Sequence, residues 1–203
     1  MERLFKKKYL LSQLCGLASA LFILDACRPS PKNEKEESQT IIVEYREALA
    51  SADSSWQVMI KSDDAKIDNM SRLADELKLI DGADTALLRS TQENIGKLKL
   101  LRYSKENMGE SGKIDQYDSS CTSAFEMLRK EISRNPKAIQ YQLVNQLKNE
   151  ITVADDSVLF YRKSYDKQAD RINHLLSRDK EGILKKEATQ FKQNPLPVFR
   201  LKP

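Results

Sequence analysis

The chain has 203 residues, of which 40% are hydrophobic and 32% are charged. This length fits one compact domain of about 150 residues with additional segments. Glycine and proline number six each, below the averages of roughly 7% and 5% in soluble domains. Sandwiches and barrels need many turns rich in these residues, so the composition argues against an all-β fold. A single histidine, His174, leaves little for zinc chemistry.

The first 26 residues differ in composition from the rest. Four basic side chains, Arg3 and Lys6 to Lys8, precede the uncharged run from Tyr9 to Leu24. A spanning helix needs about 20 apolar residues. The shorter run, interrupted by polar side chains, predicts a signal peptide over residues 1–26. An uncleaved signal anchor and a chance apolar leader are the alternatives. Both the signal peptide and the anchor place the bulk of the chain outside the cytoplasm.

The segment Leu24-Asp25-Ala26-Cys27 resembles the lipobox of bacterial lipoproteins, although Asp25 stands where a small or apolar residue is usual. The resemblance implies that the thiol of Cys27 receives lipid, palmitate included, and that Cys27 becomes the new N-terminus on a membrane. Many lipoproteins kept at an inner membrane carry Asp after this cysteine, and Arg28 stands there instead. In a two-membrane cell this favours the outer membrane.

Charge and cysteine content indicate which partners and which disulfide bonds are to be expected. Residues 1–26 hold four basic and two acidic side chains, which leaves 30 basic and 28 acidic residues beyond them. No dense Lys/Arg block follows the leader, so nucleic-acid binding is not expected. Cys15 lies in the leader and Cys27 is the predicted lipid site. Cys121 is therefore left without a disulfide partner in the mature chain.

Residues 27–38 are predicted to be the lipidated cysteine and a polar tether, because they lack apolar periodicity. Residues 39–203 are predicted to form the folded part. From Ile42 to Ile80, apolar side chains recur at heptad-like, coiled-coil spacing without Gly or Pro, which predicts one long helix. Asp63 and Lys66 interrupt this seam. Three residues apart, they are able to pair across a wetter or bent section, and a break without function is favoured over a polar site.

Turn residues divide the rest of the chain into further helices. Asp81-Gly82 ends the first helix, and Pro136 suits the first turn of another. Gly182 is expected to interrupt helix before a short final one, and Val198 and Phe199 are expected to pack back onto the core. Apolar periodicity predicts the other helices over residues 84–106, 114–132 and 136–176. The predicted fold is all-α, an elongated antiparallel four-helix bundle with two long and two shorter helices.

Motifs that carry chemistry are incomplete. The segment from Gly109 to Ile114 resembles a phosphate-binding loop, but Asn107 stands where that loop needs Gly and Ile114 where it needs Ser or Thr. His174 has no Glu three residues before it, so the helical-bundle metal motif is absent. Cys121 lies on an apolar stripe and is expected to be a buried, inert thiol. The sequence therefore predicts no catalytic residue, no metal ligand and no cofactor.

Pairs of similar side chains are interpreted as ordinary helix surface or core. Asp63-Asp64 and Asp155-Asp156 are adjacent, so each pair points to different parts of a helix and is expected to be solvated. Tyr161 and Tyr165 are spaced for core packing, with an exposed aromatic binding strip as the alternative.

A family resemblance rests on the stretch from Asn135 to Phe199. After Pro136 come the helix-packing residues Leu147 and Ile151, the acid Asp155 and the base Arg162. The pair Tyr165-Asp166, a further Asn at Asn173, and a tail with Pro195, Pro197 and Phe199 follow. Asp166 replaces the Asn of that pair. Upstream, Trp56 and Leu73 have the matching spacing, but the double Arg and Pro-Asn expected between them are absent. This pattern resembles the LemA family of bacterial envelope proteins.

The resemblance implies a helical bundle outside the cytoplasm, held near a membrane by its N-terminus, with no catalytic activity. Together with Cys27 and the tether, it predicts a lipid-anchored envelope protein that acts as a scaffold or adaptor for protein partners. The alternative is an envelope sensor or regulator that binds a small ligand or peptide within the bundle, for which the polar break at Asp63 and Lys66 is the motive. An enzyme is the least favoured class.

Overall fold

A computed structural model describes residues 31–186 and 195–199. The chain divides into two compact units, Met1–Thr40 and Ile41–Pro203. Every regular element in the described residues is a helix, and these residues contain no strand. The all-α prediction is therefore confirmed. The predicted signal peptide and Cys27 lie outside the described residues.

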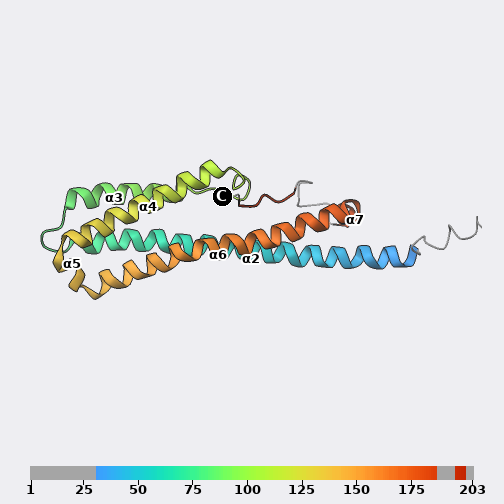
Figure 1. Cartoon of the computed structure of the whole chain (residues 1–203), viewed down its shortest axis with the longest axis horizontal. Helices are drawn as coiled ribbons and strands as arrows, with labels where there is room; N and C mark the ends of the chain where they lie inside the picture. The colour runs from blue at the N-terminus through green and yellow to red at the C-terminus, as the bar shows by residue number, and fades with distance from the viewer. Residues whose placement is uncertain (1–30, 187–194, 200–203) are drawn as a thin grey trace, which may run out of the picture. The chain divides into compact units, whose positions relative to one another are not determined.

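Two of the helices are long. Helix α2 (Pro31–Lys78) has 48 residues and α6 (Gln142–Arg178) has 37 (Figure 1). The shorter ones are α3 (Thr85–Leu101), α4 (Ser111–Arg134), α5 (Pro136–Gln140) and α7 (Lys180–Lys186).

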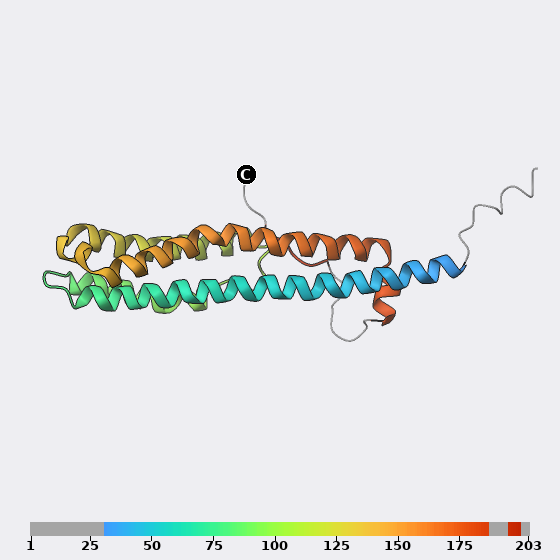
Figure 2. The same cartoon turned by 90° about the horizontal axis from the view of Figure 1, so that it is seen from below.

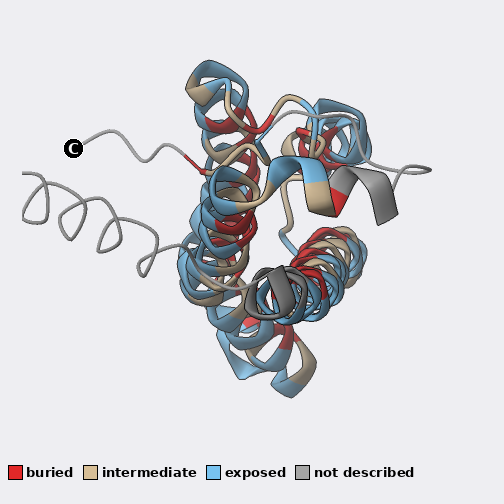
Figure 3. Ribbon diagram, turned by 90° about the vertical axis from the view of Figure 1, so that its right-hand side faces the viewer, coloured by how far each residue is buried: buried red, intermediate tan, exposed pale blue. Residues whose placement is uncertain are grey.

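Within the unit Ile41–Pro203, α2 and α6 run side by side in opposite directions (Figures 1 and 2). Polar contacts between the two helices show this antiparallel register, because residues later in α2 contact residues earlier in α6. The pairs are Glu44 and Arg171, Ser55 and Ser164, Lys66 and Asp155, and Asn69 and Glu150. The predicted heptad-like seam of α2 is buried at every position except Leu49, which is partly buried. Figure 3 shows the buried residues gathered on the sides of the helices that face one another. Burial of this apolar stripe is what stabilises such long helices in water.

The N-terminal boundary of α2 differs from the prediction. The helix begins at Pro31, whereas the sequence pattern predicted polar tether up to residue 38. Glu36, Glu37 and Thr40 are exposed, so burial does not explain the helix there. Lys and Glu are good helix formers and Pro is tolerated in a first turn, which extends the helix beyond its apolar stripe.

Two other predicted boundaries are wrong. Helix α3 ends at Leu101 and not near residue 106, because Arg102 is extended and its side chain turns toward α2. The predicted helix 136–176 is broken at Tyr141, which is also extended. There the amide of Asn145 donates to the carbonyls of Ile139 and Tyr141, so the carbonyls freed by the break stay paired.

The end of the chain follows the prediction in one respect and departs from it in another. Gly182 lies inside α7 and does not interrupt it. Its N–H donates to the carboxylate of Asp179 at 2.9 Å, which caps the helix. Val198 packs on the core and Phe199 is buried, as predicted.

Two glycines are expected to respond to alanine with opposite signs. Gly82 has φ +81°, a conformation that disfavours a side chain, so Gly82→Ala is expected to lower the free energy of unfolding by about 1–2 kcal/mol. Gly96 lies inside α3 with nothing within 4 Å of an added Cβ, so Gly96→Ala is expected to raise it by about 0.5–1 kcal/mol. Denaturant unfolding of both variants measures this. A stability gain in Gly82→Ala would contradict the assigned turn.

Candidate functional site

The predicted polar break lies in the core and not in a wetter section. Asp63 is 8% exposed and Lys66 is 5% exposed. The Nζ of Lys66 lies 3.4 Å from Oδ1 of Asp63 and 3.3 Å from Oδ1 of Asp155 on α6. The predicted pairing is confirmed, and the prediction that Asp63 is solvated is wrong. A buried carboxylate needs such partners to stay charged.

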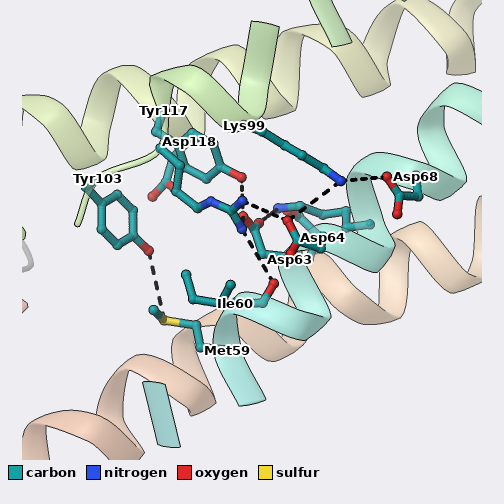
Figure 4. Close-up of polar contacts among 12 residues, drawn as sticks. Met59, Ile60, Asp63, Asp64, Asp68, Lys99, Tyr103, Tyr117 and Asp118 are labelled. Atoms are coloured by element: carbon teal, nitrogen blue, oxygen red, sulfur yellow. Dashed lines mark hydrogen bonds and ion pairs between the residues drawn. The ribbon is translucent and has the colours of Figure 1, made fainter. Parts of the chain in front are cut away.

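Two further groups reach Asp63 from outside its own helix. Nη1 of Arg102 lies 3.1 Å from Oδ2 of Asp63, and Nη2 lies 2.7 Å from Oδ1 of Asp64. The hydroxyl of Tyr117 on α4 also donates to Asp63. Figure 4 shows Tyr117 facing Asp63 and Asp64 across the space between α4 and α2. The guanidinium of Arg102 therefore bridges the two adjacent carboxylates, with one Nη atom on each.

A second buried cation, Arg162 of α6, is 2% exposed. Its two Nη atoms donate to the two carboxylate oxygens of Asp118 at 2.8 and 2.7 Å. Nε and Nη2 donate to the hydroxyl of Tyr103 at 3.3 and 3.1 Å, and that hydroxyl donates toward the sulfur of Met59 (Figure 4). We use the name polar core for these groups and the preceding ones, namely Asp63, Lys66, Arg102, Tyr103, Tyr117, Asp118 and Arg162.

The pKa directions agree with a fully paired cluster. Burial alone lowers the pKa of Lys66, but the carboxylates of Asp63 and Asp155 raise it above 10.5 overall. Burial acts in the same way on Arg162, whose pKa is nevertheless raised by Asp118 and Tyr103. Both side chains therefore stay cationic at neutral pH. The polar core links α2, α4 and α6 through buried hydrogen bonds and ion pairs.

Next to the polar core, the C-terminal segment Pro195–Phe199 lies against α6. The side-chain amide of Asn173 donates to the carbonyl of Leu196 at 2.9 Å and accepts from its N–H at 2.7 Å. About two turns earlier on α6, Oδ1 of Asp166 accepts from the N–H of Phe199 at 2.8 Å. Asp166 and Asn173 are seven residues apart and so lie on one face of the helix. Three backbone groups of the segment are held by two side chains.

The ring of Phe199 enters a cluster of aromatic side chains. It stacks on Trp56 at a centroid distance of 6.4 Å and meets Tyr103 and Tyr165 edge-on at 5.5 and 5.9 Å. The guanidinium of Arg162 lies 5.3 Å from its centroid, in the range of a cation–π contact. We call the group Trp56, Tyr103, Arg162, Tyr165, Asp166 and Asn173 the tail site.

The tail site gathers residues that the family resemblance singled out in the sequence. Trp56, Arg162, Tyr165, Asp166 and Asn173 all contact the segment that contains the matching Pro and Phe. From their spacing alone, most of these residues are predicted to pack between helices. Their common partner is a short stretch of chain near the C-terminus, which spacing along one helix does not reveal.

The remaining predicted residues lie apart from this site. Cys121 is buried, as predicted, and lines a cavity of about 140 Å³ with Lys66 and Asp155. Burial raises the pKa of its thiol, so the thiol stays protonated at neutral pH and is a poor nucleophile. His174 is exposed, and Asp155 and Asp156 are exposed as predicted.

The structure also shows the segment that resembles a phosphate-binding loop and the pair Tyr161 and Tyr165. Residues 109–114 form a turn and the start of α4, where Nζ of Lys113 pairs with Glu110 at 3.2 Å. Tyr165 is in the core, as predicted, whereas Tyr161 is only partly buried. Sequence reasoning missed Arg102 and Tyr103, which stand in the loop after α3, and Asp118, a charged residue of α4 beside its apolar stripe.

Alkaline pH is expected to destabilise the fold through its buried tyrosines. Burial raises the pKa of Tyr103 and Tyr117, and raises that of Tyr165 to about 12. A raised folded-state pKa gives stability that is present below pH 10 and is lost as pH rises through the folded values. Each pH unit in this window costs about 1.4 kcal/mol per tyrosine. Phenolate absorbance and circular dichroism measured together test this, and full ionisation at pH 10 with intact helices would contradict it.

Comparisons with known proteins find no match to this chain among protein-family models, curated proteins or solved structures. Within residues 31–186, no helix is both long and apolar enough to cross a membrane.

Proposed function

We propose that this chain is a membrane-tethered scaffold or adaptor of the bacterial envelope. It would be a LemA-like protein anchored by lipid on Cys27, with its folded part outside the cytoplasm as an elongated antiparallel four-helix bundle. The leader, the lipobox-like segment and the spacing of the family-like residues support this proposal. Its partners would be other envelope proteins, and no catalytic step is required.

The observation that carries the adaptor role is an open groove between the two long helices. The groove has a volume of about 410 Å³ and is lined from α2 and α6 by Ser62, Ala65, Lys66, Asn69, Asn149, Glu150, Val153, Ala154, Ser157 and Tyr161. Four of these side chains, two Ser and two Ala, are small. Small side chains let another helix approach closely, and an apolar helix face in a groove is a common mode of recognition.

Exposed apolar side chains border this groove. Val153, which lines it, is 65% exposed. Phe160 is 71% exposed, lies seven residues further on the same face of α6, and its ring contacts that of Tyr161 at 5.9 Å. Along α6 the groove extends from Asn149 to Tyr161, about 18 Å, or roughly three turns of a partner helix. The expected partner is an amphipathic helix with an apolar stripe of that length.

The sensor alternative rests on the polar break, and there the charges are already paired. Lys66 pairs with Asp63 and Asp155, and Asp63 also binds Arg102. A ligand would have to displace these partners. The groove on the outer surface therefore supports the adaptor role better than the break supports a ligand site.

Site-specific photo-crosslinking in native cells tests the proposal. A photo-reactive residue at Val153 or Phe160 is expected to trap one or two envelope proteins, and Cys27→Ala is expected to abolish the products. The control position is Ile139, an exposed apolar residue of α5 away from the groove. Equal products from Ile139 and Phe160 would contradict the groove, and unchanged products in Cys27→Ala would contradict the lipid tether.

A further inference from the structure

We propose that the tail site is a peptide-binding site, that Pro195–Phe199 fills it as an internal ligand, and that it takes an extended, proline-containing segment with a phenylalanine from a partner protein. This inference does not depend on the membrane tether or on the groove between α2 and α6, because it concerns a different set of residues.

The first argument is how the segment is held. Asn173 pairs with both backbone groups of Leu196, and Asp166 accepts from the N–H of Phe199. An amide that donates and accepts on one residue recognises extended backbone whatever its side chain is. The backbone contacts therefore specify a conformation and leave most of the sequence free.

The second argument is the single deep anchor. Phe199 is buried between Trp56, Tyr103 and Tyr165, beneath Arg162. Pro195 and Pro197 fix the backbone dihedral φ near −65°, which lowers the entropy lost when an extended segment binds. Docking of an extended, proline-containing segment in an aromatic-lined groove is a recurring mode of peptide recognition. The occupant is thus specified by two prolines and one phenylalanine.

The third argument is a polar group that the tail leaves unused. The hydroxyl of Tyr165 is buried and has no hydrogen-bond partner within the described residues. Leaving such a group unpaired costs about 1–3 kcal/mol in general. A partner segment that brings an acceptor to Tyr165 gains over the internal tail at this point, which favours its exchange for the tail.

Trp56 makes the exchange measurable. It is the only tryptophan of the chain, it is buried, and Phe199 stacks on it. In the full chain, Phe199→Ala is expected to shift the Trp56 emission to the red and to raise its acrylamide quenching severalfold. The control Phe160→Ala, which removes an exposed ring, is expected to leave both unchanged. Unchanged Trp56 emission in Phe199→Ala would overturn the proposed anchor.

Peptide binding in trans is the decisive step. A synthetic peptide of residues 192–203 is expected to restore the emission of Phe199→Ala saturably, whereas the same peptide with alanine at position 199 is not. It is expected to bind wild-type chain at least about tenfold more weakly, because the tethered tail competes at millimolar effective concentration. Absence of binding to a helical Phe199→Ala chain would overturn the proposal.

A second variant covers the case in which Phe199→Ala loses helix. Asn173 is only partly buried, so Asn173→Ala is expected to keep the fold, measured by circular dichroism, and to raise Trp56 quenching. In the double variant Phe199→Ala/Asn173→Ala, peptide binding is expected to be about tenfold weaker than in Phe199→Ala alone, because two hydrogen bonds are lost. A concentration-dependent dimer lost in Phe199→Ala would overturn the partner assignment in favour of a second copy of this chain.

Discussion

Replacing Asp63 by alanine is expected to lower the free energy of unfolding by about 3–5 kcal/mol. The change leaves Lys66 with Asp155 of α6 as its ion-pair partner, takes one acceptor from Arg102, and removes the acceptor of the Tyr117 hydroxyl. Each of these groups is buried or nearly so, and an unpaired charge in the core costs more than the pair contributed. Urea unfolding followed by circular dichroism measures the loss.

Asp64 supplies a matched control for Asp63. It is the next residue on α2 and binds the same guanidinium at 2.7 Å, but its side chain is 38% exposed. Water can replace that contact, so Asp64→Ala is expected to cost less than about 1 kcal/mol. Equal losses in the two variants would show that burial is not what distinguishes the two carboxylates.

The sequence predicted the helical class well because apolar spacing determines it. The seam from Ile42 to Ile80 is buried almost throughout, and its polar interruption pairs as predicted. Boundaries were harder to predict. The break at Tyr141 has no Gly or Pro beside it and depends on Asn145, whose side chain caps the freed carbonyls. Local propensity carries no sign of such a contact.

The polar core was only partly foreseeable, for a physical reason. Asp63 and Lys66 are three residues apart, so their pairing follows from helix geometry. Arg102 and Asp118 reach the same region from a loop and from another helix, 39 and 55 residues beyond Asp63 in the chain. A charged residue in a polar stretch has the sequence signature of a solvated one, and tertiary packing alone distinguishes them.

The tail site and the polar core share two residues, and this links the end of the chain to its centre. Tyr103 accepts from Arg162 and touches Phe199 with its ring. Arg162 binds Asp118 on one side and covers Phe199 on the other. Release of the tail would thus remove part of the surroundings of a buried cation. Peptide exchange and bundle stability are therefore expected to be coupled.

Arg162→Met tests this coupling and is the second large effect that we expect. Methionine keeps apolar volume but removes the paired bonds to Asp118 and leaves the Tyr103 hydroxyl without its donor. The free energy of unfolding is expected to fall by about 2–4 kcal/mol, somewhat less than for Asp63→Ala because Asp118 is half-exposed and regains water. Trp56 quenching is expected to rise as well, since Phe199 loses the guanidinium that covers it.

Arg171→Met is the matched control, since Arg171 lies on the same helix and pairs with Glu44 at 3.8 Å with both side chains well exposed. It is expected to change stability by less than about 0.5 kcal/mol and to leave Trp56 unaffected. Asp63→Ala provides a further contrast, because it disturbs the polar core without touching Phe199. If Arg162→Met lowered stability while Trp56 stayed as protected as in Asp63→Ala, Arg162 would stabilise the helices but would not hold the tail.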